Sequence, residues 1–342
     1  MDALKQVFSF VRPRKLFNAF SLVFSYHLSR WTRTTRHMGM PMSIAIEPTT
    51  ACNLGCPECP SGLKKFTRPT GNLQKQLFKQ VLDEIGEYLM NVTFYFQGEP
   101  YIHPQFLELV EMASKKNIFS STSTNAHFIN REIAEKTVRS GLSQIIISID
   151  GTTQKVYEQY RKKGYLNKVL EGSRQIIAAK KRLNSQTPKV IFQFLVVAPN
   201  EHQIEDAKKL SEELGFDEIR FKSAQLYDYE NGNDLMPEND QYRRYRQLKS
   251  GKWVIKNKME NHCWKMWHST VITWDGKLVP CCFDKDATHQ LGNIKGPQAG
   301  FKEVWKGQAY QEFRKAVLSG RKNIDICRNC TEGTKVWLEE TI

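Results

Sequence analysis

The 342-residue sequence has no hydrophobic run long enough to cross a membrane, which would take about 20 apolar residues. Its apolar stretch near the N-terminus, Leu16 to Leu28, is too short, and no small-residue signal-peptide cleavage site follows it before Trp31. We therefore expect an amphipathic helix on the protein or on a membrane surface, and a cytoplasmic protein. Polar residues interrupt the stretch at Asn18, Ser21, Ser25 and His27.

Acidic residues are fewer than basic residues in this sequence. The chain has 50 Lys and Arg against 36 Asp and Glu, a net charge of +14. Residues 1–38 carry seven basic side chains and one acid, Asp2, which gives +6. Such an excess is most often a solvated basic face, but it also suits an acidic peptide or an anionic membrane surface. No nucleic-acid-binding motif accompanies it, so we expect no nucleic-acid partner.

Internal repeats are also missing, which excludes a solenoid. Strand and helix patterns alternate instead, and such alternation implies parallel strands with right-handed helical crossovers. Six units are too few for a complete eight-unit barrel, which takes about 250 residues. The pattern predicts an α/β fold, a partial (β/α)6 barrel with its ligand at the C-terminal ends of the strands. Strands are expected at residues 43–46, 92–96, 119–124, 145–149, 190–197 and 219–221, with helices between them.

The pattern weakens after the last predicted strand. Residues 226–262 look like a linker, and the chain from Cys263 onward is short and rich in Cys and Trp. A metal cluster would help to stabilise so small a domain. The predicted organisation is a basic helical extension (1–40), a barrel core (41–225), a linker (226–262) and a small C-terminal domain (263–342).

Eight cysteines are present, and all but Cys263 lie in tight groups, which favours metal ligation in a reducing compartment. The first group, Cys52, Cys56 and Cys59, has the spacing C-x3-C-x2-C and follows the first predicted strand. Three thiolates would leave one iron of a [4Fe–4S] cluster without a protein ligand, whereas ordinary electron-transfer clusters use four. A zinc site is the alternative, but zinc usually needs a fourth Cys or His nearby.

This run, placed directly after the first strand, resembles the radical SAM superfamily. In that family the open iron binds the amino and carboxylate groups of S-adenosylmethionine (SAM). Reductive cleavage of SAM then gives a 5′-deoxyadenosyl radical that abstracts a hydrogen atom from the substrate. The resemblance implies that Cys52, Cys56 and Cys59 hold a [4Fe–4S] cluster, that SAM binds there, and that a flavodoxin or ferredoxin supplies electrons.

Other segments at strand ends are similar to the family's SAM-binding motifs. Gly98, Glu99 and Pro100 match the end of a Gly-Gly-Glu-Pro motif, with Gln97 in place of its first Gly. A carboxylate suits the SAM ammonium group, and glycine permits close backbone approach.

Two more such segments follow the third and fourth strands. Thr124 and Asn125 are similar to a Thr-Asn-Gly segment in which Ala126 replaces Gly, and Ser148 and Asp150 are similar to a Ser-x-Asp-Gly segment. Arg161 would reach the SAM carboxylate; an ordinary surface arginine beside two lysines is an equally good interpretation.

The remaining cysteines form a second set in the C-terminal region. Four thiolates complete a closed [4Fe–4S] site, but a structural zinc site uses the same set. The segments 275–282 and 291–294 are similar to a SPASM domain in its short, single-cluster Twitch form, which implies one auxiliary [4Fe–4S] cluster. The motif has the spacing G-x4-C, and counting from Gly276 this spacing selects Cys281 over Cys282 as the ligand. We expect Cys282 to be a buried bystander, or else an alternative ligand or a substrate-facing group. The expected ligands are Cys263, Cys281, Cys327 and Cys330.

The resemblance implies an enzyme that oxidatively modifies a peptide, a protein or a small molecule. A winged-helix module that would bind a leader peptide is not apparent in the sequence. The alternative is a non-catalytic iron–sulfur or zinc-binding electron-transfer protein, which would not need the Gly98–Pro100 and Ser148–Asp150 segments. No individual catalytic side chain can be named.

Overall fold

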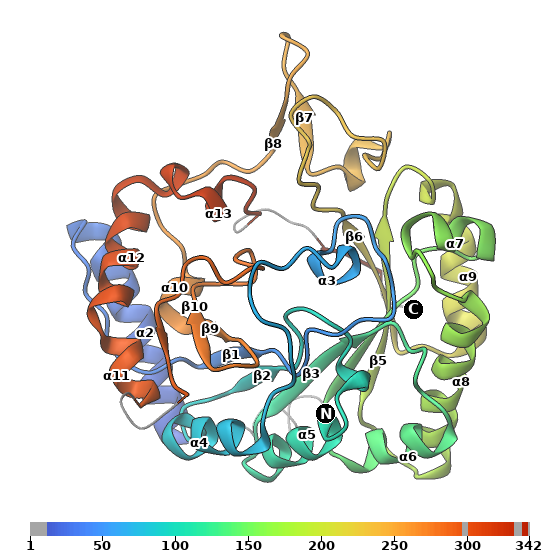
Figure 1. Ribbon diagram of the computed structural model, residues 1–342, viewed down its shortest axis with the longest axis horizontal. Coiled ribbons are helices and arrows are strands. Elements are labelled where there is room, and N and C mark those ends of the chain that lie inside the picture. The colour runs from blue at the N-terminus through green and yellow to red at the C-terminus, as the bar shows by residue number, and fades with distance from the viewer. Residues whose placement is uncertain (1–11, 296–299, 332–336, 341–342) are drawn as a thin grey trace. The chain divides into compact units, whose positions relative to one another are not determined.

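The computed structural model describes residues 12–295, 300–331 and 337–340 (Figure 1). The chain divides into two compact units. Unit 1 comprises Met1–Ala51, Phe66–Ser121 and Met259–Arg328, and unit 2 comprises Cys52–Lys65, Thr122–Lys258 and Asn329–Ile342. Asp2 and Lys5, which contribute to the basic start of the chain, lie outside the described residues.

The strands of unit 1 gather around β1 (Ser43–Ile46). On one side β1 pairs in parallel with β2 (Asn91–Thr93), and β2 pairs in parallel with the start of β3 (Phe119–Thr124). On the other side β1 pairs in parallel with β9 (Ser269–Ile272), which is followed by antiparallel β10 (Lys277–Val279) and β11 (Gly292–Asn293). Strands from the Cys-rich end of the chain therefore extend the sheet that begins with β1.

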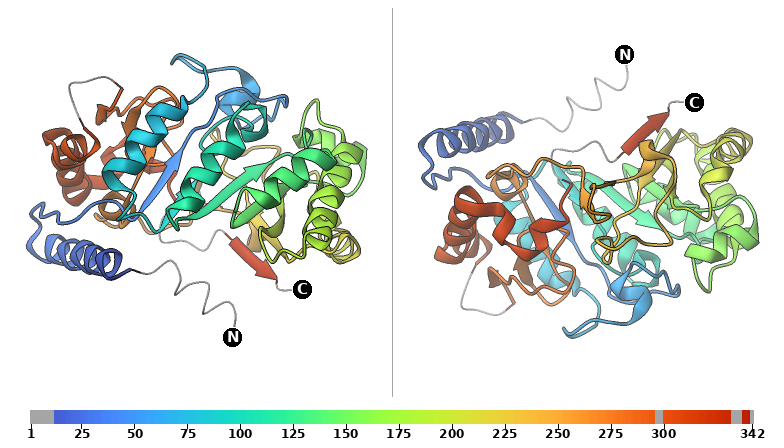
Figure 2. Two further views of the ribbon diagram at one scale, coloured as in Figure 1. Left: turned by 90° about the horizontal axis from the view of Figure 1, so that it is seen from below. Right: turned by 90° about the horizontal axis from the view of Figure 1, so that it is seen from above.

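Helices α4 (Lys75–Ile85) and α5 (Phe106–Lys115) cover the sheet of unit 1 (Figure 2). Their contact with it is aromatic: the Phe94 ring centroid lies 5.4 Å from that of Phe78 and 6.0 Å from that of Phe106, both edge to face. Such pairs add to the free energy gained by burying the rings. The remaining helices of unit 1 are α2 (Pro13–Thr32), η1 (Pro100–Ile102), α10 (Lys265–His268), α11 (Phe301–Lys306), α12 (Gln308–Gly320), η4 (Arg321–Asn323) and α13 (Asp325–Arg328).

Unit 2 holds the later strand–helix repeats. Strands β4 (Gln144–Ser148), β5 (Lys189–Val196) and β6 (Glu218–Ser223) are parallel, and β12 (Trp337–Glu340) pairs with β6 in antiparallel fashion. The isoleucines of β4 are buried on both faces, as the β-branched run predicts. The connecting helices are α6 (Arg131–Arg139), α7 (Gln154–Tyr160), α8 (Leu166–Arg182), η2 (Glu201–Gln203) and α9 (Ile204–Leu214), with the short α3 (Pro60–Leu63) in the Cys loop.

The segment expected to be a linker contains an antiparallel hairpin of β7 (Tyr245–Gln247) and β8 (Trp253–Ile255), preceded by η3 (Asp240–Tyr242). The hairpin stands out from the strands of unit 2 (Figure 1). Its strands have three residues each, too few for a recognisable alternation of polar and apolar residues.

Helix α2 contains the Leu16–Leu28 stretch and extends about one turn beyond it at each end, beginning at Pro13 and ending at Thr32. None of the helices in the described ranges is both long and apolar enough to cross a bilayer.

Candidate functional site

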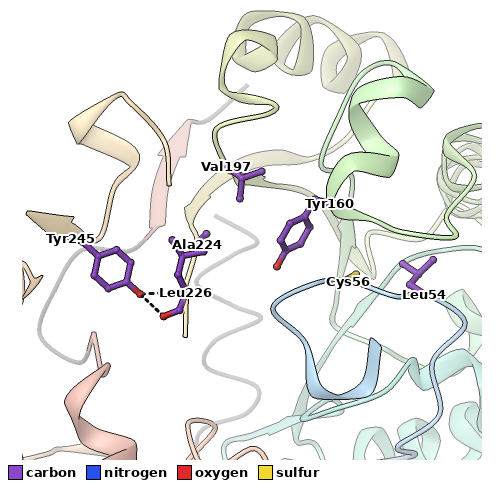
Figure 3. Close-up of a cluster of buried hydrophobic side chains, with 7 residues drawn as sticks. All are labelled: Leu54, Cys56, Tyr160, Val197, Ala224, Leu226 and Tyr245. Carbon is purple, nitrogen blue, oxygen red and sulfur yellow. Dashed lines mark hydrogen bonds between the residues drawn. The ribbon is translucent and has the colours of Figure 1, made fainter. Parts of the chain in front are cut away.

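The first cysteine group lies in unit 2, on the loop that leads into α3. Cys56 is buried, while Cys52 and Cys59 are half-buried. Both half-buried cysteines pack against an apolar cluster that contains Cys56. Figure 3 shows the buried residues of this cluster. One loop thus places three thiols within or against a single apolar cluster, here called the apolar wall, and this donor set suits an iron–sulfur cluster. The wall consists of Leu54, Cys56, Tyr160, Val197, Ala224, Leu226 and Tyr245.

A glycine fixes the path of this loop. A Cβ atom on Gly62, in α3, would lie 2.6 Å from the backbone nitrogen of Cys56 and 3.0 Å from its carbonyl oxygen. Any side chain at residue 62 would therefore push the backbone of Cys56 away. A hydrogen bond also holds the loop in place: the amide of Gly55 donates to the carbonyl oxygen of Lys162 at 2.8 Å.

Arg161 is the charged group beside these thiols. Its Nη1 donates to the Sγ of Cys56 at 3.8 Å, and its Nε donates to Oδ2 of Asp150 at 2.5 Å. Only 15% of the Arg161 side chain is exposed, so the surface-arginine interpretation is wrong. Lys162 and Lys163, the neighbours that suggested it, are exposed.

Burial and charge act against each other at this pair. Burial raises the pKa of the Cys56 thiol, and the nearby Arg161 guanidinium opposes that rise. Desolvation disfavours the charged form of Arg161, but Asp150 and Cys56 outweigh it and hold the pKa of Arg161 well above its usual value. The site therefore keeps a permanent positive charge next to the Cys loop.

Asp150 joins the ends of two strands. Its Oδ1 accepts the amide of Leu195 at 2.7 Å, and its carbonyl oxygen accepts Nδ2 of Asn200 at 3.0 Å. Asn200 in turn accepts the amide of Val197 through Oδ1 at 2.8 Å. The orientation of Arg161 is thus set by β4 and β5 together, through a fully buried carboxylate.

The segment after β3 is also organised by local hydrogen bonds. Asn125 donates through Nδ2 to Oδ1 of Asn53, at 2.8 Å, which links this strand end to the Cys loop. Ala126 has a φ of +57°, a left-handed conformation that favours glycine. Its amide donates to Oγ1 of Thr124 at 2.9 Å, and this bond helps to hold the conformation. Alanine thus takes the backbone shape that the family's Thr-Asn-Gly segment implies.

Ser148 is the remaining strand-end residue of unit 2 and is buried. Its Oγ accepts Nε2 of Gln193 from the neighbouring strand at 3.4 Å. The unit that carries the Cys loop therefore also holds five of the predicted SAM-binding residues: Thr124, Asn125, Ser148, Asp150 and Arg161.

The Gly98–Pro100 segment lies in unit 1. Gly98 has a φ of +76°, and a Cβ atom there would lie 2.2 Å from the carbonyl oxygen of Thr49. The amide of Glu99 donates to the carbonyl oxygen of Ala51 at 2.7 Å. The segment is thus pressed against the residues that immediately precede Cys52. Its Glu99 carboxylate also accepts the amide of Tyr101 at 3.2 Å, and Pro100 begins η1.

The second cysteine group is divided between the units. Cys263, Cys281 and Cys327 belong to unit 1, and Cys330 belongs to unit 2. Cys281 is half-buried, and the other three are buried. Cys282 is exposed, so the prediction of a buried bystander is wrong. Within the described ranges, no three His, Cys, Asp or Glu side chains are arranged to enclose a metal ion, so the ligand assignments rest on spacing and family.

Three residues that shape the site were not singled out from the sequence: Asn53, Tyr160 and Gly62. Asn53 follows Cys52 directly, and this position was the only signal available for it. Tyr160 and Gly62 act through packing against Cys56, which no local pattern shows.

Comparison with known families identifies the chain. The profile of the radical SAM superfamily matches residues 46–210, and that of the SPASM iron–sulfur cluster-binding domain matches residues 263–331. The chain belongs to the radical SAM superfamily and carries a C-terminal SPASM domain. It is therefore an enzyme that uses SAM and a [4Fe–4S] cluster, with auxiliary iron–sulfur binding at its C-terminal end. The non-catalytic alternative is set aside.

Several characterised proteins are similar to the chain. A tungsten-containing aldehyde ferredoxin oxidoreductase cofactor-modifying protein of Pyrococcus furiosus is 22% identical over 304 residues, 79% of this chain and 82% of its own length. A PqqA peptide cyclase of Gluconobacter oxydans is 26% identical over 59% of this chain. A mycofactocin maturase of Mycobacterium tuberculosis is 30% identical over 42% of it. These two matches cover 55% and 36% of the relatives' own lengths.

Solved structures confirm the fold class. SuiB of Streptococcus suis, bound to S-adenosylmethionine, matches 90% of this chain and 75% of its own with a TM-score of 0.62 at 13% identity. BtrN, in complex with AdoMet and 2-DOIA, matches 86% of this chain and 94% of its own with a TM-score of 0.54 at 18% identity. The predicted α/β partial barrel of radical SAM type with a C-terminal auxiliary domain is therefore confirmed.

Proposed function

We propose that this radical SAM enzyme oxidatively modifies a peptide or protein, with SAM bound against the Cys52–Cys59 loop. The observation that carries the site assignment is the position of Arg161. Its buried guanidinium lies 3.8 Å from the Cys56 thiol and is oriented by Asp150. A fixed cation at that place suits the carboxylate that SAM would present beside the open iron.

Cys52, Cys56 and Cys59 would hold the SAM-binding [4Fe–4S] cluster. The residues fit that group: three thiols share one loop, a cation stands beside them, and an apolar wall backs them. When bound, the cluster and SAM supply a 5′-deoxyadenosyl radical, which removes one hydrogen atom from the substrate. The chain's own contribution is to fix the loop through Gly62 and to shield it from water with the apolar wall.

The strand-end segments would hold the rest of SAM. The Glu99 carboxylate would accept a hydrogen bond from the amino group of SAM, since a carboxylate pairs with an ammonium. Gly98 lets the backbone run close to the residues that precede Cys52. Pro100 begins η1 and so helps to fix the direction of this segment. The polar groups of Thr124, Asn125, Ser148 and Asp150 would line the SAM pocket.

Cys263, Cys281, Cys327 and Cys330 would hold one auxiliary [4Fe–4S] cluster. Four thiolates complete the ligation of a single cluster, and the chain has only Cys282 to spare. Exposure of Cys282 supports this set, because a ligand is normally enclosed by the chain. An oxidative outcome needs an acceptor for the substrate's electron, and such a cluster is suited to that task.

The partners of this function would be a peptide or protein substrate and a flavodoxin- or ferredoxin-type reductant. The names of two relatives, a peptide cyclase and a maturase, support a peptide substrate. A net charge of +14 suits acidic partners of both kinds. A small-molecule substrate is the second candidate, because the P. furiosus relative, which matches 79% of this chain, is named a cofactor-modifying protein.

The experiment is SAM cleavage by anaerobically purified, cluster-loaded protein with dithionite as reductant. We expect 5′-deoxyadenosine from the wild type and none from a variant with Cys52, Cys56 and Cys59 changed to Ala. Peptide and small-molecule fractions of a cell extract are then added separately. A rise in 5′-deoxyadenosine with the peptide fraction alone supports the peptide substrate; a rise with the small-molecule fraction alone refutes it.

A further inference from the structure

Helix α2 turns its apolar face outward. The apolar face of α2 consists of Leu16, Phe17, Phe20, Val23, Phe24 and Trp31, and each of these side chains is exposed. The exposed fractions reach 74% for Phe17 and 83% for Trp31. At 3.6 residues per turn, the six residues fall within an arc of about 120°. This is a continuous apolar stripe along one side of the helix, not a scatter of single residues.

The opposite, inward side of α2 carries the buried Leu22 and Tyr26, but most of its residues are polar and hydrogen-bonded to the rest of unit 1. Lys15 donates through Nζ to the carbonyl oxygen of Asn117 at 2.9 Å. Asn18 exchanges two hydrogen bonds with the backbone of Met40, each 2.8 Å long, and Ser29 donates to the carbonyl oxygen of Arg36 at 2.6 Å. Rotating the helix to bury its apolar face would break all of these buried or partly buried hydrogen bonds. These bonds therefore keep the apolar face on the outside, and Figure 2 shows α2, in dark blue, at the edge of unit 1.

Positive charge lies along one edge of this face and just beyond the C-terminal end of α2. The basic rim of α2 is Arg12, Arg30, Arg33 and Arg36, and within the described part of the chain none of the four pairs with a carboxylate. The sequence has no Asp or Glu between Asp2 and Glu47. Arg14 is not part of the rim, because it pairs with Glu87.

A pocket of about 720 Å³ opens at the C-terminal end of α2, within unit 1. Its one carboxylate, Glu260, is bonded to Nε2 of His262 at 2.6 Å. The cationic groups around it therefore outnumber the acid. Its lining includes His27, Arg30, Trp31, Arg33, His262 and Lys322.

We propose that α2 binds an anionic phospholipid bilayer, with its apolar face in the interface and a lipid phosphate in the pocket beside Arg30 and Arg33. Aromatic residues over an apolar stripe, flanked by Arg, are the composition of helices that lie in a membrane interface. Anionic lipid complements the basic rim. Pairing with a second copy of the chain through the same face is disfavoured, because it would bring two basic rims together.

The test is co-sedimentation of the full, cluster-loaded chain with vesicles of phosphatidylcholine alone or mixed with phosphatidylglycerol. We expect the anionic vesicles to bind the wild type at least about tenfold more tightly than the neutral ones. The variant with Phe17, Phe20 and Phe24 changed to Ser should lose at least about tenfold in binding, since membrane affinity scales with buried apolar area. Two single substitutions form a matched pair. Phe20→Ser removes an exposed apolar side chain from α2 and should weaken vesicle binding. Leu248→Ser removes an exposed leucine from the β7–β8 hairpin and should bind as the wild type does.

A charge-matched pair separates lipid electrostatics from general basicity. Arg12, Arg30 and Arg33 changed to Gln should abolish the preference for anionic vesicles. The same loss of charge at Lys155, Arg246 and Lys249, all exposed and distant in sequence from α2, should leave it intact. Circular dichroism and iron content should be unchanged in every variant, which would exclude misfolding as the cause. The contribution of Trp31 to the fluorescence is the difference between the emission spectra of the wild type and Trp31→Phe. This difference spectrum should shift to the blue when the protein binds vesicles.

Several outcomes would overturn the proposal. If the wild type binds neither type of vesicle, α2 is not a membrane-binding helix. If the wild type is a dimer that ignores vesicles and the triple Phe variant is a monomer, the face is an interface between copies. Equal binding of both vesicle types by the wild type would exclude an anionic headgroup.

Discussion

The carboxylate of Asp150, fully buried at the end of β4, holds the guanidinium of Arg161 at an Nε–Oδ2 distance of 2.5 Å. The two residues are eleven positions apart, with the whole of α7 between them. Together they place a cation against the Cys56 thiol. The SAM assignment depends on this relationship more than on any single motif.

Arg161→Gln should weaken SAM binding by about 10- to 100-fold, the range expected for losing a hydrogen bond to a charged group. Asp150→Asn should weaken it through loss of Arg161 orientation. Lys162→Gln removes the same charge from the exposed neighbouring residue and should leave SAM binding unchanged. Equilibrium binding to cluster-loaded protein measures all three, with iron content as the check on folding. An equal loss in Lys162→Gln would show that only the net charge matters.

Gly62→Ala should disturb the Cys loop, because its Cβ would lie 2.6 Å from the backbone of Cys56. Overpacking of this kind costs about 1–3 kcal/mol of stability, and we expect incomplete cluster loading. Gly55→Ala is the matched control in the same loop, since its nearest neighbour, Cβ of Lys162, would be 3.4 Å away. Iron per chain and the thermal midpoint should fall in the first variant only. Comparable loading in both variants would contradict this account of the loop.

Two half-buried histidines should make unit 1 sensitive to acid. Burial, followed by the charge of Arg314, lowers the pKa of His37 to about 3, and burial, followed by Lys265, lowers that of His268 to about 4. The unfolded chain binds these protons near pH 6.5 while the folded chain does not, so stability falls as the pH drops below 6.5.

His37→Gln keeps a donor for the carbonyl oxygen of Trp267 but cannot titrate. Its free energy of unfolding should fall less steeply between pH 6.5 and pH 4, by up to about 1.4 kcal/mol per pH unit. Thermal midpoints of cluster-loaded wild type and variant, measured across this range, check the difference. Parallel curves would mean that His37 is protonated in the folded protein.

Cys282 should be the one thiol open to alkylation. It is exposed, whereas the seven proposed ligands are buried or half-buried. Iodoacetamide added anaerobically to the native, cluster-loaded protein should label Cys282 first, and Cys282→Ser should remove this label without loss of iron. Peptide mass mapping locates the label. Labelling of Cys281 in its place would exchange the roles of the two residues.

The sequence predicts the regular elements where a pattern extends over several residues. The bounds of β1 and β3 match the predicted ranges, and a helix, α9, lies between the last two predicted strands, ended by Gly215 in the left-handed conformation typical of a helix C-cap. The β7–β8 hairpin was missed because its strands are too short to carry a periodic signal.

The side-chain environments were harder to predict. Arg161 looked like a surface residue because Lys162 and Lys163 follow it, and its burial depends on Asp150 and Cys56, which are distant in sequence. Cys282 was expected inside because free cysteines usually are, yet it directly follows a half-buried neighbour in the chain. Both outcomes are set by tertiary contacts, which no local pattern records.

The most direct test of the central claim is the iron and labile sulfide content of anaerobically purified protein. The wild type is compared with a variant in which Cys52, Cys56 and Cys59 are changed to Ala. Two [4Fe–4S] clusters predict about eight irons per chain, falling to about four in the variant. About four irons falling to none would remove the auxiliary cluster, and zinc without iron, even after anaerobic reconstitution, would contradict the account as a whole.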